Sequence, residues 1–236
     1  MLEAENLRLD KSPREIFNVE HLILDQGEVL ALVGPNGAGK TSLLLTLALL
    51  QSPSAGVIRF TGQPVRKQDV LSLRRRMAVV FQDALLLDAS VQGNILTALR
   101  IRGVPRREAH VRAEKWLAQF GIGHLARQRA RTLSGGEAQR ASLARAFALE
   151  PEILFLDEPF ASLDYPTRNT LLNDMGRILR DMNITTLFVT HDYTEIPLLA
   201  QRVAVMFDGK LMKCGSVSEI FGEEFLQRKT WTPWEG

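Results

Sequence analysis

Residues 34–41, with the sequence Gly-Pro-Asn-Gly-Ala-Gly-Lys-Thr, restrict the fold of this 236-residue chain more than any other stretch. They fit the pattern G-x-x-x-x-G-K-[ST], a glycine-rich turn that lies between a strand and a helix. An apolar run of strand length, residues 28–33, comes directly before the turn, and a leucine-rich run typical of a buried helix, residues 41–50, comes directly after it. The sequence therefore predicts a strand–loop–helix unit.

Such a loop is typical of phosphate binding. Its glycines let the backbone turn tightly, so that successive N–H groups point at phosphate oxygens, and the following helix adds the positive end of its dipole. Lys40 is expected to reach the β- and γ-phosphates, and the Thr41 hydroxyl to ligate Mg²⁺. The alternative is a glycine-rich turn that happens to precede a lysine. The predicted nucleotide-binding residues of the loop are Gly34, Pro35, Asn36, Gly37, Ala38, Gly39, Lys40, Thr41 and Ser42.

The composition is that of a soluble globular protein, with 45% hydrophobic and 24% charged residues. The net charge of +2 is too small to argue for nucleic acid as a partner. The single cysteine, Cys214, excludes an internal disulfide and favours a reducing compartment. No signal segment opens the chain, and the longest apolar run is far shorter than the roughly 20 residues that span a bilayer. Any membrane role is therefore expected to come through a partner.

The arrangement of apolar runs predicts an α/β fold. Short strands are expected on either side of the glycine-rich loop, and strands alternate with a helix in the last third, which indicates a parallel sheet covered on both faces. Asp208-Gly209 predicts a hairpin turn. The segment 231–234, which holds Trp231 and Trp234, is either a docked tail or a frayed end. The expected strands are residues 2–9, 20–24, 57–60, 77–81, 152–157, 184–189 and 203–207, and the helix is 167–181.

Residues 90–131 differ from the rest because they have helical periodicity, with a helix start at Pro105. Residues 100–131 carry nine Arg or Lys against two Glu. Two interpretations stay open: a solvated helical face, or a docking surface for an acidic partner or for the membrane-facing side of an assembly.

Asp157 and Glu158 end the apolar run 153–156. Beside a phosphate-binding loop, Asp157 is expected to hold Mg²⁺ through water. Glu158 projects differently because it is one residue further on, and it can contact an attacking water molecule. Taken alone, the pair would be an ordinary exit from a strand.

Ser134 and Glu137 have the spacing of a capping box, which predicts a helix that begins at Gly135. A capping box alone does not call for the two glycines Gly135 and Gly136, each of which costs about 1 kcal/mol of helix propensity relative to alanine. Their bare N–H groups at a helix start predict an anion site.

These motifs, together with Gln82, Ser162-Leu163-Asp164 and His191, occur in the order seen in the ATP-binding cassettes of ABC transporters, and the chain resembles that family over nearly its whole length. The resemblance implies an α/β fold: a P-loop NTPase (RecA-like) core with an N-terminal antiparallel β subdomain and an inserted α-helical subdomain. It implies one domain, residues 1–236, with a β and RecA-like core in 1–88 and 150–236 and a helical subdomain with the signature motif in 89–149.

The resemblance also implies the roles of the residues. Two cassettes stack head to tail, and each ATP lies between the loop 34–41 of one copy and Ser134, Gly135 and Gly136 of the other. Glu158 is the general base, His191 contacts the γ-phosphate, and Gln82 contacts Mg²⁺ and the water. Asp164 signals across the dimer. The implied metal ligands are Thr41, Gln82 and Asp157, and the implied cofactors are ATP and Mg²⁺.

Two departures from the family pattern are visible. Members usually carry an aromatic residue about two dozen positions before the loop, but residues 9–13 hold no ring, and Phe17 is assigned to the core. The preference for adenine therefore stays open. Glu137 stands where many members have Gln, and little loss is expected because a carboxylate still completes the capping box. Ser162 to Asp164 can also be an ordinary cap before Pro166, and His191 alone can be structural.

Thr190-His191-Asp192 followed by Glu195 resembles the importer branch, as does the segment Phe81-Gln82. The resemblance implies an ATPase whose hydrolysis drives solute uptake through a separate membrane permease at the cytoplasmic face of the membrane, with a solute-binding protein as indirect partner and no nucleic acid. The chain ends soon after the cassette, so the regulatory domain of sugar importers is expected to be absent. In this compactness the chain resembles cassettes that serve oxyanion or amino-acid import, and tungstate or a related oxyanion is the preferred cargo. The rival is a non-transport cassette that acts on nucleic acid or ribosomes.

Overall fold

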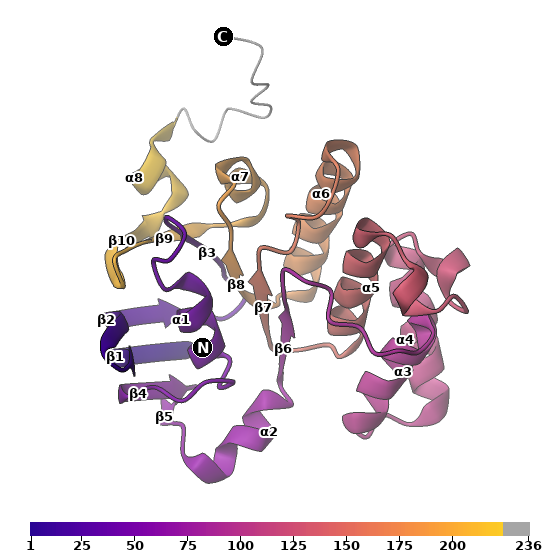
Figure 1. The fold of residues 1–236 in the computed structure, drawn as a ribbon, viewed down its shortest axis with the longest axis horizontal. Helices are drawn as coiled ribbons and strands as arrows, with labels where there is room; N and C mark the ends of the chain where they lie inside the picture. Colours follow the sequence, from indigo (N-terminus) through magenta and orange to yellow (C-terminus); the bar gives the residue numbers. More distant parts are fainter. Residues whose placement is uncertain (224–236) are drawn as a thin grey trace. The chain divides into compact units, whose positions relative to one another are not determined.

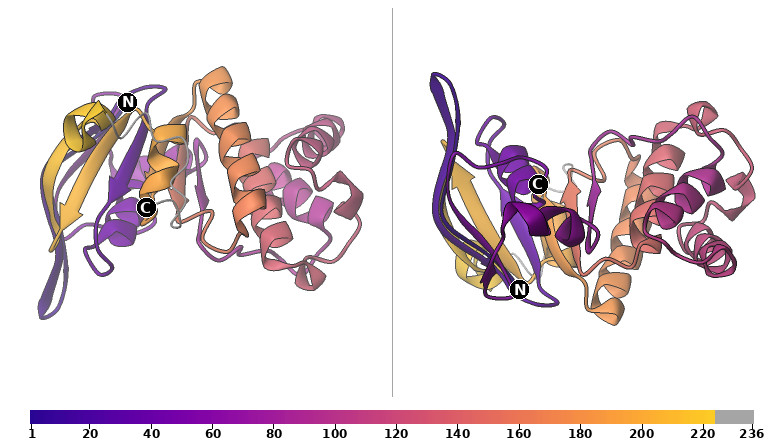
Figure 2. Two further views of the ribbon diagram at one scale, coloured as in Figure 1. Left: turned by 90° about the horizontal axis from the view of Figure 1, so that it is seen from above. Right: turned by 90° about the horizontal axis from the view of Figure 1, so that it is seen from below.

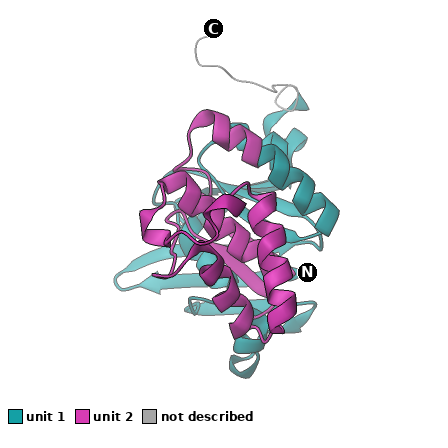
Figure 3. Cartoon of the chain, turned by 90° about the vertical axis from the view of Figure 1, so that its right-hand side faces the viewer, with its two compact units in different colours: residues 1–74, 172–236 teal, residues 75–171 magenta. Residues whose placement is uncertain are grey.

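The computed structural model describes residues 1–223, so the segment with Trp231 and Trp234 lies outside the described residues. The chain divides into two compact units, which are considered separately below (Figure 3). Unit 1 comprises Met1–Arg74 and Leu172–Gly236, and unit 2 comprises Arg75–Leu171. Both contain strands and helices (Figure 1).

The first sheet of unit 1 is antiparallel, with the strand order β2-β1-β4-β5. The predicted strand 2–9 extends further and forms a long hairpin with β2 (Figure 2). Leu2 and Ala4 are buried, and after Asn6, whose φ is 48°, burial shifts to Leu7 and Leu9. This irregularity keeps leucines on the covered face of the strand. The strands are β1 (Leu2–Lys11), β2 (Arg14–Leu24), β4 (Ala55–Phe60) and β5 (Gln63–Pro64).

The second group of strands in unit 1 surrounds β3 (Val29–Val33), all five residues of which are buried. β3 pairs in parallel with β8 (Thr185–Val189) and with β9 (Arg202–Phe207). β9 turns back into β10 (Lys210–Ser216) at Asp208 and Gly209, whose φ values are 43° and 75°, so the predicted hairpin turn is confirmed. The helical segments of this unit are α1 (Lys40–Leu47), η1 (Lys67–Asp69), α2 (Val70–Arg74), η4 (Tyr193–Glu195), α7 (Ile196–Leu199) and α8 (Val217–Phe221).

Unit 2 holds the parallel pair β6 (Met77–Val80) and β7 (Ile153–Asp157), together with three packed helices. These are α3 (Val91–Ile101), α4 (Arg106–Gln119) and α5 (Gly135–Ala148) (Figure 1). Trp116 and Phe120 of the α4 segment pack on Phe147 of α5, with ring centroids 5.2 and 5.4 Å apart. This buried aromatic cluster fixes α5 against α4. Two short turns, η2 (Gly123–Leu125) and η3 (Ala130–Thr132), join α4 to α5.

The predicted fold class is confirmed: the chain is α/β, with one antiparallel sheet and parallel strands around the glycine-rich loop. α4 begins at Arg106 after Pro105, as the sequence predicted. The helix predicted at 167–181 is longer, since α6 runs over Tyr165–Met182. No helix among residues 1–223 is long and apolar enough to cross a membrane.

Candidate functional site

The loop 34–39 joins β3 to α1, and its glycines are required by what packs on them. Gly39 caps α1 with a φ of 98° and no side-chain hydrogen bond. A Cβ built on Gly39 would lie 2.8 Å from the carbonyl oxygen of Ile16, and one on Gly34 would lie 2.0 Å from the carbonyl oxygen of Met206. Because backbone atoms approach this closely, no side chain fits at either position.

The same loop fits a polyphosphate. At Gly37, with a φ of 81°, a Cβ would meet no atom within 4 Å, so the loop is open at this point. The Lys40 side chain is 6% exposed, and its Nζ donates to the carbonyl oxygens of Gly34 at 2.8 Å and Pro35 at 3.0 Å. The ammonium group is thus held inside the loop, at a helix N-terminus that no side chain caps. Both features favour an anion.

His191 follows the strand next to the loop. β3 and β8 are parallel neighbours with Leu32 opposite Val189, so their carboxyl ends lie at one edge. The Thr190 hydroxyl donates to Glu195 at 2.6 Å and accepts the Asp192 N–H at 2.9 Å, which fixes the backbone on both sides of the exposed His191. The importer-like Thr-His-Asp pattern is therefore a hydrogen-bonded turn, and sequence reasoning missed this role of Thr190 and Glu195.

In unit 2, Asp157 is the last residue of β7 and is 7% exposed. Glu158 follows with a φ of 47°, a left-handed conformation that costs a non-glycine residue about 1–2 kcal/mol. Such strain clusters at functional sites. Gln82 comes just after the neighbouring strand β6, whose Val80 lies opposite Leu156, so the ends of β6 and β7 bring Gln82 and the two carboxylates to one edge.

Three polar residues that the sequence did not single out hold the segment around Gln82. Gln139 of α5 is fully buried and donates to the carbonyl oxygen of Phe81 at 3.2 Å. Asn94 of α3 is buried too, and it pairs with the N–H of Leu87 at 2.7 Å and with its carbonyl oxygen at 3.1 Å. Arg145 donates to the carbonyl oxygen of Leu85 at 2.8 Å. For Asn94 and Gln139, the sequence signal that could have indicated this role is an amide side chain within a helical stretch.

The helix α5 begins at Gly135 with Ser134 as its cap, so the predicted capping box is confirmed. Neither Gly135 nor Gly136 has a positive φ. A Cβ on Gly135 would lie 4.0 Å from Ser162, an ordinary contact, whereas one on Gly136 would lie 3.2 Å from the buried side chain of Leu163, which is closer than an ordinary contact. Backbone geometry therefore does not demand glycine here, and the fold leaves this helix start uncovered.

Asp164 caps α6, because its carboxylate accepts the Thr167 N–H at 3.1 Å. This hydrogen bond lowers the pKa of Asp164. The prediction of an ordinary cap before Pro166 is thus confirmed.

Phe17 is fully buried, as the sequence analysis expected. The turn between β1 and β2 exposes Lys11, Ser12, Pro13 and Arg14, none of which carries a ring. The close approach of Gly39 to Ile16 places the start of β2 beside the loop. The β1–β2 turn therefore supplies no aromatic surface for a base.

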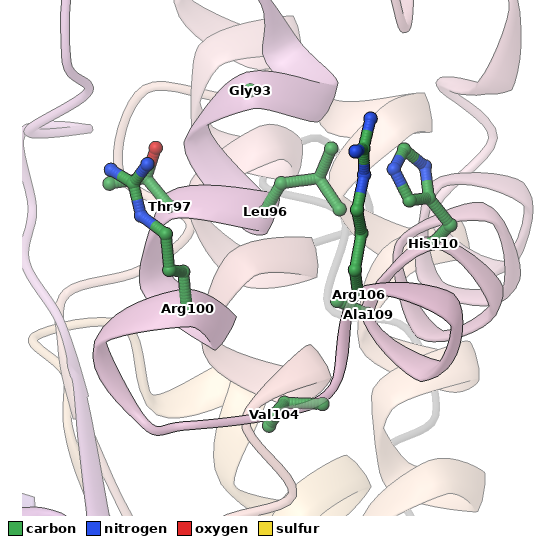
Figure 4. Close-up of a pocket in the computed structure, with 8 residues that line it drawn as sticks. All are labelled: Gly93, Leu96, Thr97, Arg100, Val104, Arg106, Ala109 and His110. Carbon is green, nitrogen blue, oxygen red and sulfur yellow. The ribbon is translucent and has the colours of Figure 1, made fainter.

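A cavity of about 610 Å³ lies between α3 and α4 (Figure 4). Leu96, Val104 and Ala109 supply its apolar lining, and basic side chains flank them. Figure 4 shows Arg106 and His110 side by side, with Arg100 on α3. Other arginines of the basic stretch are tied into the fold: Arg102 donates to the carbonyl oxygen of Met77 at 2.7 Å.

Comparisons with known proteins agree with this arrangement. Residues 17–161 match the family profile described as ABC transporter. The chain is 41% identical over 199 residues to the molybdate/tungstate import ATP-binding protein WtpC of Thermococcus kodakarensis, covering 84% of this chain and 60% of the relative. It is 37% identical to the sulfate/thiosulfate import ATP-binding protein CysA of Pseudomonas putida, covering 94% and 68%.

The solved structure of cbiO1 from Clostridium perfringens, described as part of the ABC transporter complex cbiONQ, superposes with a TM-score of 0.86 at 30% identity, covering 97% of this chain and 93% of that one. The chain spans about three fifths of the length of the WtpC relatives that it matches. By its sequence match, its fold and its motifs, the chain belongs to the ABC transporter family.

Proposed function

We propose that this chain is the ATP-hydrolysing subunit of an ABC importer. The main support for the proposal is that the motifs lie at the carboxyl ends of two pairs of parallel strands. β3 and β8 carry the glycine-rich loop and His191, while β6 and β7 carry Gln82, Asp157 and Glu158. Carboxyl ends of parallel strands are where α/β proteins bind ligands. The proposed division into a core of 1–88 and 150–236 and a helical part of 89–149 goes with this function.

In this proposal the loop and Lys40 bind the triphosphate. The hydroxyl, amide and carboxylate oxygens of Thr41, Gln82 and Asp157 are hard donors that suit Mg²⁺, which neutralises charge on the phosphates when bound. Glu158 accepts the proton of the attacking water, and its strained backbone supports a fixed orientation of the carboxylate. His191 donates to the γ-phosphate from its hydrogen-bonded turn.

The second copy of the chain completes the site. Ser134, Gly135 and Gly136 bind the γ-phosphate of the partner's ATP, head to tail. The support for this step is the uncovered start of α5, where the backbone conformation does not require glycine. A glycine pair that costs helix propensity and satisfies no backbone constraint is expected where a ligand approaches the backbone closely.

The partner in the membrane is an integral permease that docks on unit 2. Leu85 and Leu87 are 60% and 50% exposed, and their backbones are hydrogen-bonded to the side chains of Arg145 and Asn94. Exposed apolar side chains on a fixed backbone are typical of an interaction site. The basic cavity between α3 and α4 favours an acidic or helix-C-terminal element of the partner. Of the two interpretations of the basic stretch, docking is the one proposed.

The cargo is proposed to be a tetrahedral oxyanion, with tungstate or molybdate first. The support is the names of similar relatives, which import molybdate/tungstate or sulfate/thiosulfate. A solute-binding protein would deliver the anion to the permease. In proteoliposomes that hold the permease and this chain, the binding protein loaded with tungstate should stimulate ATP hydrolysis more than the same protein without it. Equal rates with and without tungstate would contradict this cargo.

Replacement of one carboxylate tests the enzyme proposal. Glu158→Gln should lower phosphate release by about 10²- to 10⁴-fold, the usual contribution of a general base. The same variant should form a dimer when ATP and Mg²⁺ are added, as measured by light scattering after gel filtration. Glu152→Gln, an exposed carboxylate beside the start of β7, is the matched control and should keep normal turnover. Normal turnover in Glu158→Gln would contradict the assignment.

A further inference from the structure

The hydroxyl group of Ser134 is held by its own helix. Oε2 of Glu137 accepts the Ser134 N–H at 2.8 Å and the Ser134 hydroxyl at 2.8 Å. The Ser134 oxygen in turn accepts the Glu137 N–H at 3.4 Å. A hydroxyl has a single proton, so Ser134 cannot donate to a phosphate while Glu137 accepts that proton.

In the other described box of the same type, at the start of α8, Glu219 accepts the Ser216 N–H at 2.7 Å and Ser216 accepts the Glu219 N–H at 3.2 Å. There the Ser216 hydroxyl also lies 3.3 Å from the Ser218 hydroxyl. The N–H pairing is common to both boxes, and in each box hydrogen bonds from the serine lower the pKa of the glutamate.

Glu137 is ionised at neutral pH. The hydrogen bonds from the Ser134 N–H and hydroxyl lower its pKa, and Arg140 and His124 add smaller effects in the same direction. A negative carboxylate in the first turn also offsets the positive end of the α5 dipole, which otherwise attracts anions.

We propose that Glu137 is a positioning residue that holds the Ser134 hydroxyl away from the γ-phosphate and thereby raises the ATP concentration needed to close the dimer. The inference rests on the proposed function of Ser134. When ATP arrives, the hydroxyl leaves the carboxylate and donates to the phosphate, so closure exchanges one charge-assisted hydrogen bond for another. Most of the gain from that contact is lost in the exchange.

Glutamine at this position would keep the cap and hold the hydroxyl less tightly. Its amide oxygen can accept the Ser134 N–H as the carboxylate does, but its hydrogen bond with the hydroxyl is neutral and about half as strong as a charge-assisted one. It also removes one negative charge. Glu137→Gln should therefore strengthen ATP-dependent closure without disturbing the start of the helix.

The test measures the ATP concentration at half-maximal dimer formation in the Glu158→Gln background. Adding Glu137→Gln should lower this concentration by roughly three- to tenfold, the range for a hydrogen bond that is exchanged rather than lost. With Glu158 intact, Glu137→Gln should lower KM similarly and change kcat by less than about twofold, because binding alone is altered. Glu219→Gln is the matched control and should shift neither value. Thermal unfolding checks that each variant is folded.

Ser134→Ala distinguishes the interaction of Glu137 with the Ser134 hydroxyl from the general effect of removing one negative charge. In a Ser134→Ala background, Glu137→Gln should shift the half-maximal ATP concentration by less than about twofold, because no hydroxyl remains to be released. A shift of equal size with and without the hydroxyl, or no shift at all, would overturn the role of Glu137 and leave the dimer intact. If Glu158→Gln forms no dimer with ATP, the proposed function fails, and this inference with it.

Discussion

Two helices of this chain begin with glycines at places where a phosphate is proposed to bind, and they are built in different ways. At α1, no side chain caps the helix, and neighbouring backbone atoms leave no room for a Cβ on Gly34 or Gly39. At α5, Ser134 and Glu137 cap the helix, and there is room for a Cβ at Gly135. The fold therefore requires Gly34 and Gly39 before α1, whereas it leaves room for a side chain at Gly135 of α5.

The difference follows from how each helix is held. α1 follows the buried strand β3 after the loop 34–39, and Leu43, Leu44 and Leu47 bury the helix within unit 1. Its start therefore passes close to other backbone. α5 is held by the rings of Trp116 and Phe147 and by its own capping box, and Gly135 in its first turn is exposed. A helix that is stable without a ligand can keep its first turn open for one.

The largest effect is expected for Gly39→Ala. The new Cβ would be forced against the carbonyl oxygen of Ile16 in a left-handed backbone. The free energy of unfolding should fall by about 2–4 kcal/mol, since an alanine at an incompatible φ adds strain to a steric clash. Urea unfolding followed by circular dichroism measures this. Gly62→Ala, also at positive φ but with open space around it, is the control and should cost less. Equal stability of Gly39→Ala and the wild type would contradict the claim that the fold requires glycine at this position.

Gly135→Ala should show the opposite pattern. ATP turnover should fall by about 10- to 100-fold, because a methyl group would cover the N–H groups that are proposed to bind the phosphate. The free energy of unfolding should stay the same or rise by up to about 1 kcal/mol, since alanine is the better helix former. Steady-state kinetics and urea unfolding on one preparation give both values. A strong loss of stability together with activity would mean that the fold, after all, requires this glycine.

The base should matter less than the triphosphate. Since the turn between β1 and β2 exposes no ring and Phe17 is buried, adenine gains no stacking there. The KM values for ATP and GTP should therefore lie within about fivefold of each other, because stacking worth roughly 1–3 kcal/mol is missing. A KM for GTP that exceeds the KM for ATP by a factor of fifty would show that another group recognises adenine.

A fall in pH should weaken the stabilisation of the start of α5 by Glu137, and this is the smallest of the expected effects. Hydrogen bonds lower the pKa of Glu137 in the folded chain, so its stabilisation is complete above the usual carboxylate pKa and is lost as the pH falls through the lowered value. The difference in melting temperature between the wild type and Glu137→Ala should shrink as the pH falls from 6 to 3. α1 has no acidic residue in its first turn. A difference that does not depend on pH would contradict the ionised cap.

Local patterns predicted much of this molecule, because turn and cap chemistry lies in adjacent residues. The loop 34–41, the capping box at Ser134 and the hairpin at Asp208 were all predicted from such spacing, and the structure has a turn or helix start at each. Contacts between residues far apart in the sequence were missed. Gln139 reaches the backbone of Phe81 across 58 positions, and no local pattern indicates that pairing.

The extent of the first hairpin was also missed. Phe17 and Val19 pair with Leu9 and Leu7, so β2 begins six residues earlier than the predicted start at residue 20. Arg14 and Glu15, the first residues of β2, are exposed and gave no strand signal, and pairing with Lys11 and Asp10 of β1 keeps them extended. The strain at Glu158 is likewise invisible in the sequence, because a left-handed glutamate depends on the packing around it.

The dependence of turnover on protein concentration tests the composite site most directly. If one copy binds ATP at the loop 34–41 and a second copy seals it with Ser134, the rate per subunit must rise with subunit concentration and level off once dimers dominate. Ser134→Ala should raise the subunit concentration at which the rate levels off, because the partner's ATP loses a hydrogen-bond donor. A rate per subunit that stays constant upon dilution, at full speed and unchanged in Ser134→Ala, would contradict the account.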